Sequence, residues 1–117
     1  MGILDLIKAP DYDAIDAVAV ESNLLMCTES KPRQSVIKKL KVGSLVNLKL
    51  TKQNRQNVYI VSNYKTSDVI GEISYGTSDY LAQNYKNYKM LGKVTEIGKF
   101  TPMGSGKQVR IEYKVYL

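Results

Sequence analysis

Read from residue 33, the chain runs RQSVIKKLKVGSLVNLKLT (33–51), NVYIVSN (57–63) and SDVIGEISYGTSDYLA (67–82), and these three segments decide its fold. The first segment starts with apolar residues at helical spacing and then changes to strict alternation. The second is a short run of strand length, and the third is a strand that leads into another short helix. The order therefore predicts a helix, three strands joined by polar connections over residues 51–57 and 63–68, and a second helix.

Both helices of this region are expected to be short. The first should bury Val36, Ile37 and Leu40 on one face. The second should begin with Thr77 or Ser78 as its N-terminal cap, since hydroxyl side chains accept hydrogen bonds from the free N–H groups of the first turn.

Strands are also expected on either side of this region. Ala17–Glu21 should form the first strand, and Ser22-Asn23 after it is typical of a turn. Leu91–Ile97 and Gln108–Tyr116 should form the last two strands, joined by a glycine-rich loop (98–107) with basic residues at both ends.

Alternation and glycine position add detail to this sheet. The last strand should turn Val109, Ile111, Tyr113 and Val115 inward. Gly71, inside a strand, marks a bulge or a close backbone approach. We therefore expect a mainly β fold, a small OB- or SH3-like partly open barrel of about five to seven strands with two short helices. Such a barrel has little room inside, so function is expected on its outer surface.

Length and composition indicate one folded domain with an acidic leader. The chain is 44% hydrophobic and 24% charged, which is ordinary for a globular protein. Residues 1–16 read as a leader with a short amphipathic turn that packs on the flank or docks on a partner, and residues 17–117 as a single barrel domain. No apolar run has the length of a membrane span, and the first residues do not resemble a secretory signal. A cytoplasmic location without a membrane partner is expected.

Residue types that carry common catalytic chemistry are scarce. The chain has no histidine, the usual general base at neutral pH, and only one cysteine, Cys27. We expect Cys27 to be a small apolar filler near a strand end. The carboxylates of the barrel fall on separate elements, so no pair is placed for acid–base work or metal binding. The sequence predicts a protein that is not an enzyme and needs no metal or cofactor.

Charge is distributed unevenly along the chain. The formal net charge is +6, yet residues 1–30 hold six acids and one base, whereas residues 31–117 hold sixteen bases and five acids. A basic body favours polyanion binding, although lysines also serve solubility. Because fourteen of the seventeen bases are lysine, no arginine cluster for reading base sequence is evident.

Tyrosines are interleaved with these lysines, a pattern typical of single-strand binders and also of half-buried strands in small barrels. Those expected at or near the core are Tyr59, Tyr80 and Tyr113. Those expected to be exposed platforms for base stacking are Tyr64, Tyr75, Tyr88 and Tyr116.

Three segments resemble HIRAN domains, small β-rich modules found beside DNA translocases and alone in bacterial proteins. Residues 33–43 are similar to the family's "RQ…L…G" entry to a long strand. Residues 69–82 resemble its "IGYL" strand and following helix, and residues 93–116 its last hairpin. The resemblance covers roughly residues 17–117 and implies an OB-like barrel that grips single-stranded DNA, in some members at a free 3′ end.

The family's signature, approximately N-P-Y-D-x-N-A, aligns with residues 52–58 of this chain. Asn57 matches, while the tyrosine position holds Asn54 and the aspartate position, which accepts a hydrogen bond from the terminal hydroxyl, holds Arg55. An arginine can pair with a backbone phosphate instead. Asn57 either contacts the ligand or ties the loop to the following strand.

The expected function is therefore a non-catalytic nucleic-acid-binding module, with single-stranded DNA or DNA ends favoured. The residues expected to bind are Lys52, Arg55, Asn57, Tyr64, Lys65, Lys107 and Arg110. The alternative is a protein-interaction module, such as a small mobile-element inhibitor of a host nucleic-acid enzyme. In that case the acids of the leader (residues 1–16) would mimic phosphates and bind a protein partner.

Overall fold

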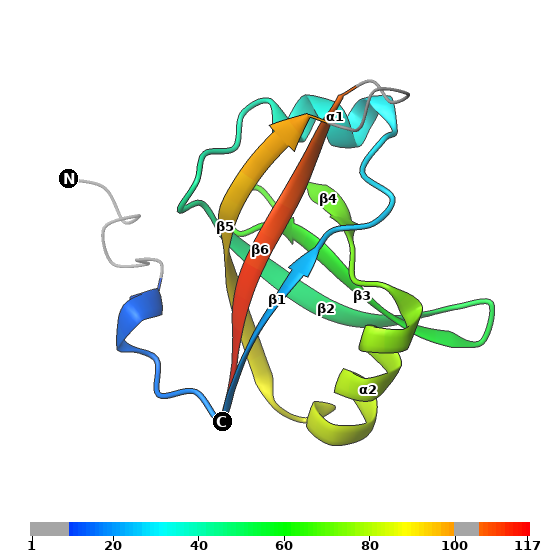
Figure 1. Ribbon diagram of the computed structural model, residues 1–117. Helices are drawn as coiled ribbons and strands as arrows, with labels where there is room; N and C mark the ends of the chain where they lie inside the picture. Colours follow the sequence, from blue (N-terminus) through cyan, green and yellow to red (C-terminus); the bar gives the residue numbers. More distant parts are fainter. Residues whose placement is uncertain (1–9, 100–105) are drawn as a thin grey trace.

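The computed structural model describes residues 10–99 and 106–117 and confirms the mainly β prediction (Figure 1). A 3-10 turn, η2 (Tyr12–Ala14), precedes the sheet. In chain order the other elements are β1 (Ala19–Leu24), α1 (Lys31–Ile37), β2 (Leu45–Gln53), β3 (Gln56–Asn63), β4 (Val69–Glu72), α2 (Tyr75–Tyr85), β5 (Lys89–Lys99) and β6 (Lys107–Tyr116). Within the described residues no helix is long and apolar enough to cross a membrane.

The six strands form one antiparallel sheet in the order β1-β6-β5-β2-β3-β4. Its two edges meet where the chain leaves β1: Met26 N donates to Glu72 O at 2.8 Å, and Glu72 N donates to Met26 O at 2.9 Å. This single bridge curls the sheet into a small, partly open barrel. Helix α1 lies across one end of it, and α2 lies beside the tip of the β2–β3 hairpin (Figure 1).

The core lies inside this curl. Val109, Ile111, Tyr113 and Val115 of β6 are all fully buried, which confirms the predicted alternation. The apolar face of α1 closes one end of the core, with Ile37 buried. Burial of aliphatic and aromatic side chains at about 25 cal/mol per Å² supplies most of the stabilisation of such a small barrel.

Gly71 permits the closure of the barrel. A register shift between Val61 and Ser62 marks a bulge where β3 pairs with β4. A Cβ at Gly71 would lie 2.9 Å from both Met26 O and Thr28 Cγ2. The predicted bulge and close backbone approach are therefore both present, and any side chain here would push the two edges apart.

Two local predictions were wrong. Ser22 and Asn23 are not a turn, because they pair with Glu112 and Ile111 inside β1. Helix α2 begins one turn earlier than expected, with Ser74 as its N-cap. Ser78 is instead buried within the helix, where its hydroxyl accepts from Tyr59 N and donates to Ile73 O, both at 3.0 Å. The hydroxyl that resembled a cap joins β3 to α2.

Two burial predictions were also wrong. Tyr80 is 53% exposed, because α2 turns Ser78, Leu81 and Ala82 toward the barrel and leaves Tyr80 on its outer face. Cys27 is exposed as well. It has a left-handed backbone (φ +57°) in the loop after β1 and is no core filler.

The part of the leader that the structure describes lies against the outer face of β5 and β6. Tyr12 is buried, and its hydroxyl donates to Glu112 Oε1 at 2.7 Å. The Nζ of Lys114 donates to Tyr12 O at 2.9 Å and lies 4.6 Å from the ring centroid, while Lys93 Nζ lies 4.9 Å from it. The predicted amphipathic turn near the N-terminus falls in residues 1–9, outside the described residues.

Candidate nucleic-acid interface

The β2–β3 hairpin ends in a tight two-residue turn rather than the longer polar connection that the sequence suggested. Gln53 pairs with Gln56, so only Asn54 and Arg55 lie between the strands. Both have positive φ, +50° and +66°, as a type I′ turn requires. Asparagine tolerates this conformation, but arginine normally avoids it, since its Cβ crowds the following carbonyl.

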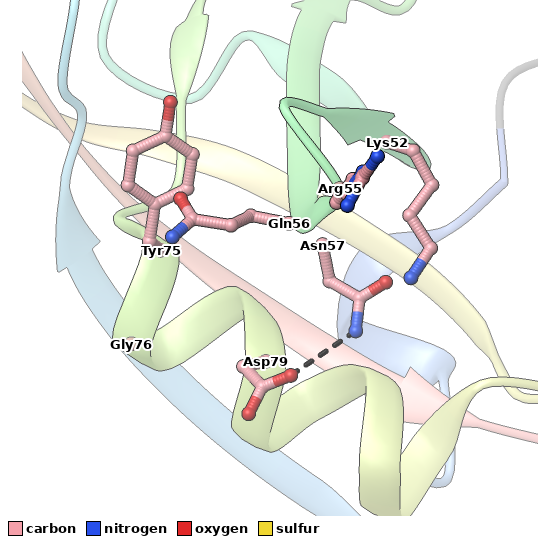
Figure 2. A pocket seen from close by; sticks show the side chains of 7 residues that line it. All are labelled: Lys52, Arg55, Gln56, Asn57, Tyr75, Gly76 and Asp79. Atoms are coloured by element: carbon pink, nitrogen blue, oxygen red, sulfur yellow. Dashed lines mark hydrogen bonds between the residues drawn. The ribbon is translucent and has the colours of Figure 1, made fainter.

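A pocket of about 410 Å³ opens between this hairpin tip and the start of α2 (Figure 2). Its lining residues are Lys52, Arg55, Gln56, Asn57, Tyr75, Gly76 and Asp79. Lys52 and Arg55 are exposed, and within residues 10–99 and 106–117 neither forms an ion pair with a carboxylate. We call this the hairpin pocket.

The one carboxylate in the hairpin pocket is already engaged. Asp79 Oδ1 accepts from Asn57 Nδ2 at 3.1 Å, and Asp79 Oδ2 accepts from Gln83 Nε2 at 2.7 Å. Figure 2 shows the amide of Asn57 turned toward the helix. Asn57 thus joins β3 to α2, rather than tying the hairpin loop to the following strand as the structural alternative had it.

Tyr75 forms another wall of the hairpin pocket. It is the first residue of α2 and is 46% exposed. It also lines a smaller, mostly apolar pocket of about 150 Å³ with Met26, Cys27 and Ile73. The Tyr75 side chain thus stands between a cationic cavity and an apolar one. The sequence marked Tyr75 as a platform but did not include it among the binding residues.

An ion pair contributes one residue, Glu72, to the lining of the apolar pocket. Arg33 Nη1 lies 3.0 Å from Glu72 Oε2 and donates to Cys27 O at 2.6 Å. Partial burial, followed by the negative charge of Glu72, raises the pKa of the Cys27 thiol. No three acidic, cysteine or histidine side chains of the described segments lie together in a way that could hold a metal ion.

The remaining predicted binding residues lie elsewhere. Tyr64 and Lys65 follow β3 at the other end of the β2–β3 hairpin. Seven residue steps separate Gln53–Gln56 from Val46–Asn63, which is roughly 23 Å at about 3.3 Å per residue.

Lys107 and Arg110 are exposed on β6, where the backbone of Lys107 pairs with the side chain of Gln34 of α1. The predicted set therefore divides into three locations, and only Lys52, Arg55 and Asn57 share a pocket.

Of the four predicted tyrosine platforms, only Tyr75 is well exposed. Tyr64, Tyr88 and Tyr116 are half-buried. Tyr88 packs against the core and meets Tyr85 edge-to-face at 5.3 Å between ring centroids. Tyr88 is therefore held by the fold, and among the four predicted platforms Tyr75, which lines the hairpin pocket, is the candidate for stacking.

The leader acids within the described residues are all exposed. Asp11 accepts from Asp13 N at 3.2 Å, and Asp13 lies 3.9 Å from Lys93 Nζ. Asp16 is exposed on the same segment. Asp5 lies outside the described residues.

Comparison of the chain with protein-family models, curated proteins and solved structures finds no match.

Proposed function

We propose that this protein is a non-catalytic nucleic-acid-binding module that holds single-stranded DNA at the hairpin pocket. The observation that carries the proposal is the pairing of two cations, Lys52 and Arg55, with the exposed ring of Tyr75 around one open cavity. Membership of the HIRAN family is part of this proposal and rests on the order of the matching segments.

The chemistry of the pocket suits a nucleotide. A backbone phosphate gains charge-assisted hydrogen bonds from Lys52 and Arg55 on the hairpin side. The face of Tyr75 offers a surface on which an unpaired base stacks, worth about 1–3 kcal/mol per base. In a duplex the bases are already stacked, so single strands are favoured. Asp79, held by Asn57 and Gln83, repels phosphate from the helix side.

Arg55 also shapes the expected specificity. A carboxylate accepts a hydrogen bond from a terminal 3′-hydroxyl, whereas a guanidinium cannot accept one. We therefore propose binding along the strand through phosphates rather than through a free 3′ end. A strand with a blocked 3′ end should bind as well as an unblocked one.

Fluorescence anisotropy across a salt series tests the proposal with labelled single-stranded, 3′-blocked and duplex DNA. The variants are Arg55→Glu, Lys52→Glu and Tyr75→Ala. Lys89→Glu is the matched control, because Lys89 is also exposed and lies at the start of β5, beyond the far end of α2. The charge reversals at the pocket should weaken single-strand binding and flatten its salt dependence more than the control does.

Equal losses in Arg55→Glu and Lys89→Glu would show that only net charge matters and would overturn the site. Lys107→Glu shows whether the contact reaches β6, as the sequence suggested. Absence of binding at low salt would overturn the proposal and turn attention to a protein partner. Removal of Asp11, Asp13 and Asp16 would then test the leader.

A further inference from the structure

A second cationic pocket lies at the opposite end of the β2–β3 hairpin. Its volume is about 340 Å³. The polar side chains that line it belong to Lys39, Lys41, Ser44, Asn63, Tyr64 and Lys65. We call it the lysine pocket. It shares no residue with the hairpin pocket.

Charge in the lysine pocket is of one sign. Lys39, Lys41 and Lys65 are exposed, and no carboxylate belongs to the lining. Among the described residues none of the three lysines forms an ion pair. The nearest acid in sequence is Asp68, on the same turn as Lys65 and outside the lining. Three lysines that line one cavity bring like charges together, and an anion bound in the cavity would relieve their repulsion.

One wall of the pocket is a hydrogen-bonded turn after α1. Lys41 N donates to Ser44 Oγ at 3.0 Å, and Ser44 N donates back to Lys41 O at 2.9 Å. Gly43, at φ +97°, donates to Val94 O at 2.7 Å and so fastens the turn to β5. The backbone that carries Lys41 is therefore fixed before any ligand arrives.

The other wall is equally well held. Asn63 Oδ1 accepts from Lys65 N at 2.8 Å, and Ser67 N donates to Asn63 O at 2.8 Å. Tyr64 N donates to Leu45 O at 3.0 Å, which joins this wall to the first. Ordering two loops usually consumes part of the binding free energy, and here that cost is small because both turns are already closed.

From this geometry we infer that the lysine pocket is a phosphate-binding site independent of the hairpin pocket. Ammonium groups bind phosphate as point charges with freely rotating donors. The phosphate comes either from a free polyphosphate or from the backbone of a nucleic-acid strand. The pocket lies roughly 23 Å from the hairpin tip at about 3.3 Å per residue, so a strand of several nucleotides would be needed to reach both.

The test is a titration of the ¹⁵N-labelled full chain with tripolyphosphate, in which the amide chemical shifts are measured by NMR at each step. We expect saturable shifts in the two turns, residues 41–44 and 63–66. The double variant Lys39→Ala/Lys65→Ala should weaken the affinity about tenfold or more, since bonds to charged groups are lost. The control Lys86→Ala/Lys89→Ala removes the same charge from exposed positions after α2 and should keep the affinity.

The source of the phosphate is assigned by adding a single strand of twelve nucleotides. If it moves the same amides, the phosphate belongs to nucleic acid; if only tripolyphosphate moves them, the ligand is free. Arg55→Glu must retain the tripolyphosphate response, which keeps this result separate from the hairpin pocket. Shifts spread evenly over the surface, or equal losses in both double variants, would overturn the inference.

Discussion

Replacement of Arg55 by glycine separates the strain of the hairpin turn from the charge that the proposed function uses. Arg55 has a φ of +66° and makes no ion pair within the described residues. A left-handed backbone costs a residue with a Cβ about 1 kcal/mol or more. Glycine relieves this strain, but its greater conformational freedom in the unfolded chain cancels roughly half of the stabilisation. The free energy of unfolding should therefore rise by about 0.5 kcal/mol, measured as a higher urea midpoint.

The same substitution should weaken DNA binding. One phosphate contact to a single strand contributes about 0.7 to the slope of log affinity against log salt. At about 0.1 M salt that slope corresponds to roughly fivefold in affinity, so Arg55→Gly should lose about that much in anisotropy titrations. Arg55→Lys keeps both the charge and the backbone strain, and should match the wild type in both assays. A glycine variant with unchanged affinity and salt slope would refute the phosphate contact, and a less stable one would refute the strain.

Three further predictions concern buried and reactive side chains. Tyr59 is buried and its hydroxyl has no hydrogen-bond partner among the described residues. Tyr59→Phe should therefore raise the free energy of unfolding in urea by about 1 kcal/mol. Tyr113→Phe, which loses the hydrogen bond to Asn23, should lower it by a similar amount. Burial first, and the hydrogen bond to Glu112 second, raise the pKa of Tyr12 above 10. The folded state then holds this proton more tightly than the unfolded state, so stability falls as the pH rises beyond about 10. The melting temperature of Tyr12→Phe should fall less steeply with alkaline pH than that of the wild type, and equal slopes would contradict this prediction. Cys27 is the only cysteine and lines the apolar pocket beside Tyr75. Bound single-stranded DNA should therefore slow the alkylation of Cys27 several-fold, whereas a strand without bases should leave the rate unchanged. An unchanged rate with normal DNA would mean that bases do not enter that pocket.

The sequence predicted those parts of the fold that depend on periodicity. Alternation in β6 identified Val109, Ile111 and Val115 as core residues, and helical spacing identified Ile37. Gly71 signalled a close approach, although its partner, the chain near Met26, could not be inferred from local pattern. Periodicity reports which face of an element is buried, and it is silent on which distant segment covers that face.

Local signals failed where one residue type serves two purposes. Ser78 has the hydroxyl of a helix cap, but inside α2 it satisfies a buried N–H of β3 instead. Ser22 and Asn23 are frequent in turns, yet pairing with β6 keeps them in a strand. The candidate site was only partly predicted for a similar reason. The polar hairpin segment that carries Lys52 and Arg55 was recognised, whereas its sharing of a pocket with Tyr75 depends on where α2 starts.

The backbone conformation of two residues, Cys27 and Arg55, gives an independent reason to look for function around Tyr75. Four non-glycine residues in the described segments have positive φ: Cys27, Asn54, Arg55 and Ser67. Asparagine adopts this conformation readily, but arginine and cysteine rarely do. Arg55 lines the hairpin pocket and Cys27 lines the apolar pocket, and Tyr75 belongs to both. Strain that adds nothing to stability is typically retained where it positions a side chain for a ligand. Since a glycine in place of Arg55 would relieve that strain, the proposed phosphate contact supplies a reason for an arginine at this position.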